Sequence, residues 1–327
     1  MRFACLASAL TLAFGLASAA PPAHAQGAPY PTKPIRIVIG FAPGGAADQV
    51  ARAMSDAFGK ALGQSVVIDN KPGNGSSIAA DIVAKSPPDG YTLLIASPSS
   101  ILVNPALNPK LLYTAKDLMP ITKMTTSPLV LAVNADTGIK SVAELIDAGK
   151  KAPGSLNYAT SGNGSAPHLG AALFSQLTGV QMVHVPYRGG AQAIQSVMAG
   201  ETHLTFGTSP TVLPMAAGGR LRPLAVSTRE ASALVPGLPG MKDAGLPAYN
   251  IEFWYGMFAP AGTPAGVAER VYAATVHAMR EPAVKDALAR QGTEVSTSAS
   301  RAEFERFLAE DDKFWVGLVR SAKVEVN

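Results

Sequence analysis

The sequence predicts an α/β protein with two lobes built on parallel sheets. Two observations favour this class. Strand-like and helix-like segments alternate along the 327 residues, and a unit of strand, glycine-rich turn and helix occurs near residue 35 and again about 120 residues later. Alternating strands and helices are typical of parallel sheets with right-handed crossovers. With 47% hydrophobic and 15% charged residues, the chain can form two cores.

The first of these units occupies residues 34–62. Residues 35–39 are mostly β-branched, as in a strand covered on both faces, and apolar residues then recur at helical spacing up to Leu62, just before Gly63. Gly44 and Gly45 therefore lie at the helix entrance. Amides there lack intrahelical partners and carry the positive end of the helix dipole, so we expect a small carboxylate to bind. The alternative is a turn that binds nothing.

The remaining chain continues the alternation. Strands are predicted at 65–69, 92–96, 129–133, 156–159, 183–187, 204–206, 221–226 and 253–258. Helices are predicted at 78–85, 142–150, 169–177, 191–199, 265–280, 283–290 and 302–321. Asn-Pro and Gly-Pro content favours irregular loops around 104–109 and 236–247.

The order of these elements predicts discontinuous lobes. A second set of strand and helix units begins near Leu129, and the strand at 253–258 is followed by helices. We therefore assign 26–126 plus 253–327 to one lobe and 127–252 to the other. Two chain crossings between the lobes would form a hinge.

The first 25 residues have the features of a secretory signal peptide. Arg2 forms a basic start, an apolar stretch follows, and the small-residue motif at 23–25 precedes Gln26. We expect export to the periplasm and cleavage after Ala25. Cys5 is the only cysteine and precedes the apolar stretch, so neither a lipid anchor nor a disulfide partner is expected.

Charge and motifs exclude several classes of function. The 27 basic and 23 acidic side chains give a net charge of +4 and are scattered, which does not support nucleic-acid binding. No H-E-x-x-H motif or cysteine cluster predicts a metal site. The glycines at 40–45 fit neither a Walker A loop nor a dinucleotide fingerprint, so we expect no cofactor.

One enzymatic alternative stays open. Ser165 and His168 could serve as nucleophile and base of an exported α/β hydrolase. The residues around Ser165 do not form a G-x-S-x-G elbow, and no acidic residues cluster near the pair. Ligand binding or helix capping is the preferred interpretation, and we expect no enzyme.

Several longer stretches resemble one protein family. They read YPTKPIRIVIGFAPGGAADQVAR, VVIDNKPGNGSSIAADIVAKSPPDGYTLL, LNYATSGNGSAPHLGAALF, VHVPYRGGAQAIQSVMAG, LRPLAVST and FWYGMFAPAGTP. In this order they resemble the Bug family, the extracytoplasmic receptors of tripartite tricarboxylate transporters. The resemblance implies a type II periplasmic-binding-protein fold, with two α/β lobes, a hinge and a ligand cleft. It also implies a small carboxylate ligand, membrane transporter subunits as partners, and a monomer.

The resemblance also implies the ligand-binding residues. They come from two loops, one in each lobe, and from the turn after the third strand: Phe41, Pro43, Gly44, Gly45, Asp48, Ser97, Ser99, Thr160, Ser161, Gly162, Gly164, Ser165 and His168. Two further candidates follow from side-chain chemistry and not from the resemblance, the Thr208 hydroxyl and the Trp254 ring. Relatives commonly carry an acidic residue or its amide soon after the Phe206 strand, where this chain has Gly207 and Thr208. Without that group, recognition of an ammonium is not expected.

Two of these assignments have structural alternatives, and Arg188 is a further residue with two interpretations. Asp48 in the first helical turn could stabilise the helix dipole without touching a ligand. Trp254 could belong to a lobe core rather than to the cleft. Arg188 could clamp a carboxylate, although a solvated loop arginine is the preferred interpretation.

Overall fold

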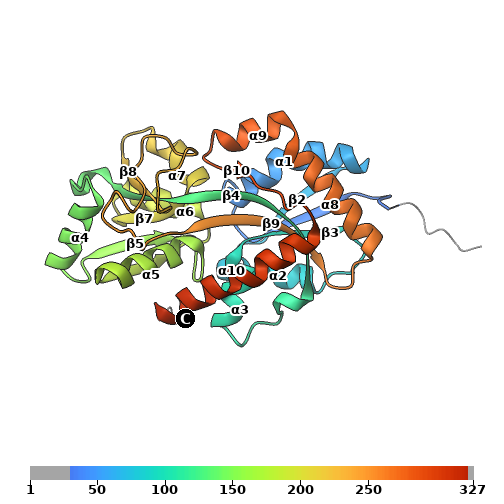
Figure 1. Cartoon of the computed structure of the whole chain (residues 1–327), viewed down its shortest axis with the longest axis horizontal. Helices are drawn as coiled ribbons and strands as arrows, with labels where there is room; N and C mark the ends of the chain where they lie inside the picture. Colours follow the sequence, from blue (N-terminus) through green and yellow to red (C-terminus); the bar gives the residue numbers. More distant parts are fainter. Residues whose placement is uncertain (1–29, 323–327) are drawn as a thin grey trace, which may run out of the picture.

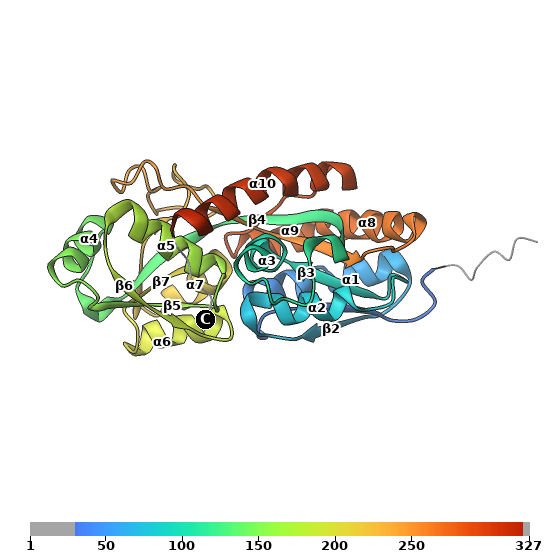
Figure 2. The ribbon, with the colours of Figure 1, turned by 90° about the horizontal axis from the view of Figure 1, so that it is seen from below.

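A computed structural model describes residues 30–322. The predicted signal peptide and its cleavage site after Ala25 lie outside the described residues. Figures 1 and 2 show an elongated molecule with two α/β lobes side by side. Within residues 30–322, no helix is both long and apolar enough to cross a membrane.

The first lobe is built on three parallel strands in the order β2-β1-β3. The strands and the helices that connect and cover them are β1 (Ile35–Ile39), α1 (Ala46–Leu62), β2 (Val66–Asn70), α2 (Ser77–Ala84), β3 (Thr92–Ala96), α8 (Ala265–Arg280) and α9 (Pro282–Ala289). The apolar stripe of α1 is buried, and Gly63 ends the helix in the left-handed conformation at φ 71. The predicted first unit is therefore confirmed.

The second lobe repeats this arrangement with β5, β6 and β7. Its elements are α4 (Val142–Lys151), β5 (Leu156–Thr160), α5 (Ala166–Thr178), β6 (Met182–Pro186), α6 (Gly190–Ala199), β7 (Leu204–Thr208), α7 (Ser209–Ala216) and β8 (Leu221–Val226). Strand β5 pairs in parallel with β6 and β7. The Ser141 side chain caps α4 by accepting from the Glu144 backbone N–H at 3.1 Å, as predicted.

Two long antiparallel strands connect the lobes. The prediction of parallel sheets is therefore confirmed for β2-β1-β3 and for β7-β5-β6 but is wrong for these two strands. They are β4 (Leu118–Asn134) and β9 (Glu252–Pro260), which pair with each other. Strand β4 pairs with β9 up to Pro128 and with β7 and β8 from Leu129 onward. The predicted lobe boundaries at 126/127 and 252/253 fall on these two strands and stay a prediction.

The end of β3 leads into helical structure where irregular loop was predicted. A π-helical segment (Ser99–Val103) continues directly into α3 (Asn104–Leu107), which includes Pro105. Short elements complete the chain: helical turns at 74–76, 115–117 and 135–137, and β10 (Glu294–Val295), which pairs with β4. Helix α10 (Arg301–Ser321) lies along both lobes (Figure 2).

Candidate functional site

A small enclosed cavity lies between the lobes. Its volume is about 20 Å³, which is room for roughly one or two water molecules. Its walls come from the β1–α1 loop, the α5 entrance, α6, β7, α7 and β9. The lining residues are Phe41, Gly45, Ala46, Ser161, Ala166, Pro167, Gly190, Ala193, Ile194, Thr205, Gly207, Thr208, Thr211, Phe253 and Tyr255. None of these side chains carries a charge.

The β1–α1 loop brings some of its predicted residues to the cavity and not others. Phe41 and Gly45 line it, whereas Pro43 and Gly44 are not among its walls. Asp48 is buried and accepts hydrogen bonds from the Gly44 backbone N–H at 3.0 Å and from Arg52 Nε at 2.8 Å. Asn70 Nδ2 donates to its second oxygen at 3.1 Å. Asp48 thus stabilises the β1–α1 loop through these hydrogen bonds. Its predicted contact with a ligand stays a prediction.

These bonds set the ionisation of Asp48. Burial on its own would raise the pKa of the carboxyl group. The hydrogen bonds from Arg52, Gly44 and Asn70 outweigh this effect and lower the pKa. The first loop therefore contains a stable anion, the Asp48 carboxylate, and this group already accepts a hydrogen bond from the Gly44 backbone N–H.

Four serine hydroxyls near the loop ends are buried without a partner among residues 30–322. They belong to Ser76, Ser97, Ser99 and Ser165. Ser97 follows β3, which pairs with β1 through Ile39 and Ile95, so Ser97 lies beside the β1–α1 loop. Buried polar groups almost always find a protein or water partner, so these hydroxyls are candidates for water or ligand contacts. Three of them were predicted, and Ser76 was missed.

The second loop is held by two histidines. Thr160 Oγ1 lies 2.6 Å from His184 Nε2 and accepts the Gly162 backbone N–H at 3.2 Å. The Gly164 backbone N–H donates to His168 Nδ1 at 3.1 Å. The two imidazoles stack with ring centroids 4.0 Å apart. His168 and His184 therefore hold loop residues 160–164 in place. No sequence motif links these two histidines, so their pairing was not predicted.

Both histidines are neutral at ordinary pH. Burial lowers the pKa of His168 to about 3, with a further contribution from His184, and burial lowers the pKa of His184 to about 4. His168 faces His184 and Tyr158, which differs from the expected ligand contact. The Ser165 hydroxyl has no hydrogen-bond partner within residues 30–322, His168 included, so the pair forms no nucleophile–base dyad.

The two GNGS turns meet across the lobes. A Cβ added at Gly75 would overlap the Asn163 carbonyl, and one added at Gly164 would overlap Asn104 Oδ1. Both glycines also have positive φ, at 55 and 67. Asn104 Nδ2 in turn donates to the carbonyls of Asn74 and Gly75 at 2.9 and 3.0 Å. These turns therefore need glycine in order to approach each other.

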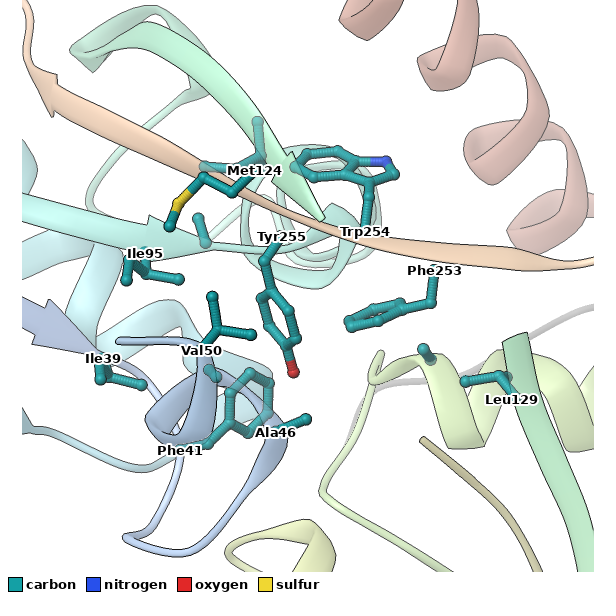
Figure 3. Close-up of a cluster of buried hydrophobic side chains, with 14 of the residues drawn as sticks. Ile39, Phe41, Ala46, Val50, Ile95, Met124, Leu129, Phe253, Trp254 and Tyr255 are labelled. Carbon is teal, nitrogen blue, oxygen red and sulfur yellow. The ribbon is translucent and has the colours of Figure 1, made fainter. Parts of the chain in front are cut away.

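Strand β9 presents different side chains from the one predicted. Successive residues of a strand point to opposite faces. Figure 3 shows Phe253 and Tyr255 on one side of β9 and Trp254 on the other. Trp254 packs on Phe304 and Phe307 and donates to Asp311 Oδ2 at 2.6 Å, so it belongs to the core beneath α10. Phe253 and Tyr255 line the cavity instead. The period-two alternation of β9 could have indicated that these two residues share one face and that Trp254 lies on the other.

The end of β7 supplies hydroxyls. Thr208 lines the cavity, and its Oγ1 lies 3.0 Å from Thr211 Oγ1. Its predicted ligand contact stays a prediction. Thr205 and Thr211 also line the cavity and were not predicted. Arg188 lies beside an outer depression lined by both GNGS turns, and it does not line the central cavity.

Known proteins resemble this chain over most of its length. Residues 50–323 match the family described as "Tripartite tricarboxylate transporter family receptor". The chain is 33% identical over 300 residues to Protein BugT of Bordetella pertussis (strain Tohama I), covering 91% of this chain and 92% of that protein. The structure of R. palustris Rpa4515 with adipate matches with a TM-score of 0.87 and 31% identity, covering 90% of this chain and 99% of that one. Periplasmic binding protein BugD matches with a TM-score of 0.83 and 28% identity, covering 90% and 99%.

Proposed function

The chain belongs to the tripartite tricarboxylate transporter receptor family, and from this premise we propose that it captures a small carboxylate between its lobes and delivers it to membrane subunits of such a transporter. The observation that supports the carboxylate most directly is the uncharged cavity wall, which consists of backbone groups, hydroxyls and apolar side chains. Adipate, with which the similar Rpa4515 structure was solved, is a carboxylate of this kind.

Neutral donors are sufficient for useful affinity. A hydrogen bond to a charged group contributes about 1.5–3 kcal/mol, and a micromolar complex needs about 8 kcal/mol after ordering costs. Several bonds from Ser161, Thr208 and the helix entrances reach that range. The ligand's charge is then stabilised by dipoles rather than by an arginine or lysine.

The same wall argues against an amino-acid ligand. A ligand ammonium buried in the cavity would need an acidic partner, and an unpaired buried charge costs several kcal/mol. No Asp or Glu side chain is among the cavity-lining residues. We therefore propose a dicarboxylate, tricarboxylate or aromatic carboxylate without an amine, with Phe41 and Phe253 covering its apolar body.

Ligand entry requires the lobes to separate. A cavity of about 20 Å³ does not admit a dicarboxylate with these walls in place. We propose hinge bending at the two crossings on β4 and β9, with residues 26–126 plus 253–327 moving against 127–252. An open-state experimental structure tests this, and movement of residues 30–126 independently of 253–322 would contradict it.

A paired mutagenesis experiment tests the binding mode. Isothermal titration calorimetry with adipate is run on the wild type, Ser165→Ala and Arg188→Ala. We expect Ser165→Ala to weaken binding about tenfold and Arg188→Ala to leave it unchanged. Loss of binding in Arg188→Ala with no change in Ser165→Ala would show that an ion pair carries recognition. An esterase panel run alongside is expected to show no turnover.

The compartment and partners complete the proposal. The basic, apolar and small-residue segments of the first 25 residues support export and cleavage after Ala25, in line with a periplasmic receptor. We propose that a monomer docks on the transporter. N-terminal sequencing of the exported protein and light scattering test the cleavage site and the monomer, and a start other than Gln26 or a dimer would contradict them.

A further inference from the structure

Tyr255 is one of the residues that line the central cavity. Its ring packs edge-on against Phe253, with centroids 5.0 Å apart, and the residue is 5% exposed. Figure 3 shows the hydroxyl directed at Phe41 and Ala46, where α1 begins. The ring is thus fixed, and the polar end faces the space between the lobes.

The hydroxyl differs from those of other tyrosines in its surroundings. Tyr30, Tyr113, Tyr249 and Tyr272 each donate to a backbone carbonyl, at 2.7, 2.6, 2.9 and 2.9 Å respectively. The Tyr255 oxygen accepts from the Ala47 backbone N–H, but its O–H has no acceptor among residues 30–322. Tyr158 and Tyr187, whose hydroxyls also have no acceptor there, line outer depressions instead. A buried tyrosine hydroxyl normally has a partner. Tyr255 therefore presents an unpaired donor to the cavity.

The surroundings keep this group a donor. Burial raises the pKa of Tyr255 far above the physiological range, and the Ala47 backbone N–H facing the oxygen opposes this effect only in part. The phenol is thus protonated throughout the physiological pH range. The nearby N–H, at the positive end of the α1 dipole, also polarises the O–H toward an acceptor in the cavity.

We infer that the Tyr255 hydroxyl binds the ligand directly, by donating a hydrogen bond to a carboxylate oxygen held beside the α1 entrance. This inference rests on the proposed function, since it needs a carboxylate in the central cavity. Strand β9, which connects the lobes, thus contributes a hydrogen-bond donor in addition to the donors of the two loops. The ligand then contacts the connecting strand as well as both lobes.

The test is a conservative substitution. Tyr255→Phe keeps the ring against Phe253 and removes only the O–H. Calorimetric titration with adipate and glutarate should show about 10- to 100-fold weaker binding than the wild type, the effect of one hydrogen bond to a charged group. Tyr272→Phe, whose hydroxyl donates to the Ser298 carbonyl away from the cavity, is the matched control and should bind as the wild type does.

A second measurement separates ligand contact from packing. In a ¹⁵N-labelled protein, saturating ligand should shift the Ala47 amide more in the wild type than in Tyr255→Phe, because only the wild-type hydroxyl couples that N–H to the carboxylate. Equal affinity of Tyr255→Phe and wild type overturns the inference but not the proposed function. Weaker binding by Tyr255→Phe with the same Ala47 shift as in the wild type does so too. A wild type that binds neither adipate nor glutarate contradicts a dicarboxylate as the ligand of the proposed function and removes the premise of the inference.

Discussion

The β1–α1 loop is held in place by a buried carboxylate, whereas the loop after β5 is held by two uncharged imidazoles. In the first, Asp48 accepts from Gly44, Arg52 and Asn70. In the second, His184 contacts Thr160 and His168 accepts from Gly164. Both arrangements fix a glycine-rich turn at a helix entrance. The difference indicates that a charge holds the first loop in place, while the side chains that line the central cavity are uncharged.

The largest effect should come from removing the carboxylate. Asp48→Ala leaves the Gly44 N–H and the Asn70 amide without their buried acceptor, and we expect about 2–4 kcal/mol lower free energy of unfolding. Asp48→Asn is the control, because its oxygen can still accept from Gly44, and it should lose about half as much. Urea denaturation measures both. Equal stability of Asp48→Ala and wild type would show that the first loop does not depend on this anion.

Acid should affect the second loop first. The histidines bind protons near pH 6.5 when unfolded, but only near pH 3 and pH 4 when folded. The unfolded state therefore binds more protons between these values, and stability falls as the pH drops from about 6.5 toward 3. The contribution of Asp48, whose pKa is lowered from 3.8, is instead lost below about pH 4.

A substitution isolates the histidine contribution. The Oδ1 of an asparagine can replace His168 Nδ1 as acceptor for the Gly164 N–H without titrating. His168→Asn should therefore flatten the stability curve between pH 6 and 4 by roughly 1–3 kcal/mol relative to the wild type. Thermal unfolding measured at several pH values tests this. An unchanged slope would mean that His168 is accessible to protons in the folded state.

The smallest effect is expected from the exposed end of the first network. The Arg52 side chain is 57% exposed and pairs with Asp48 at 2.8 Å. Arg52→Ala should cost about 0.2–1 kcal/mol, as for other solvated ion pairs, and less at high salt. A loss as large as that of Asp48→Ala in urea denaturation would make the ion pair, rather than the buried amide bonds, the support of the loop.

Local patterns in the sequence predicted much of the fold. The stripe of α1 with its Gly63 stop, the Ser141 cap and the two-lobed α/β class are confirmed. The direction of β9 was predicted wrongly, because an apolar run has the same sequence pattern whether its neighbours are parallel or antiparallel. The single long β4 was also missed, since prolines at 120 and 128 favour a break. Pro120 lies at one of its register shifts, and Pro128 lies where its pairing passes from β9 to β7.

The site was harder to predict than the fold. The glycines and serines of the loops lie between a predicted strand and a predicted helix. Their position at a helix entrance could therefore be predicted from the neighbouring sequence. The orientation of Trp254 depends on which face of β9 is turned toward the cavity, and that is decided by α10 packing far along the chain. The roles of His184 and Tyr255 likewise depend on contacts with Thr160 and the α1 entrance, which no spacing rule encodes.

The central claim is that neutral donors recognise an amine-free carboxylate. Glutarate and glutamate differ only in the ammonium group, so their calorimetric titration into the ligand-free protein tests the claim most directly. We predict that glutarate binds at least about tenfold more tightly, because the cavity wall has no acidic side chain to pair with an ammonium. Tighter binding of glutamate would contradict this claim.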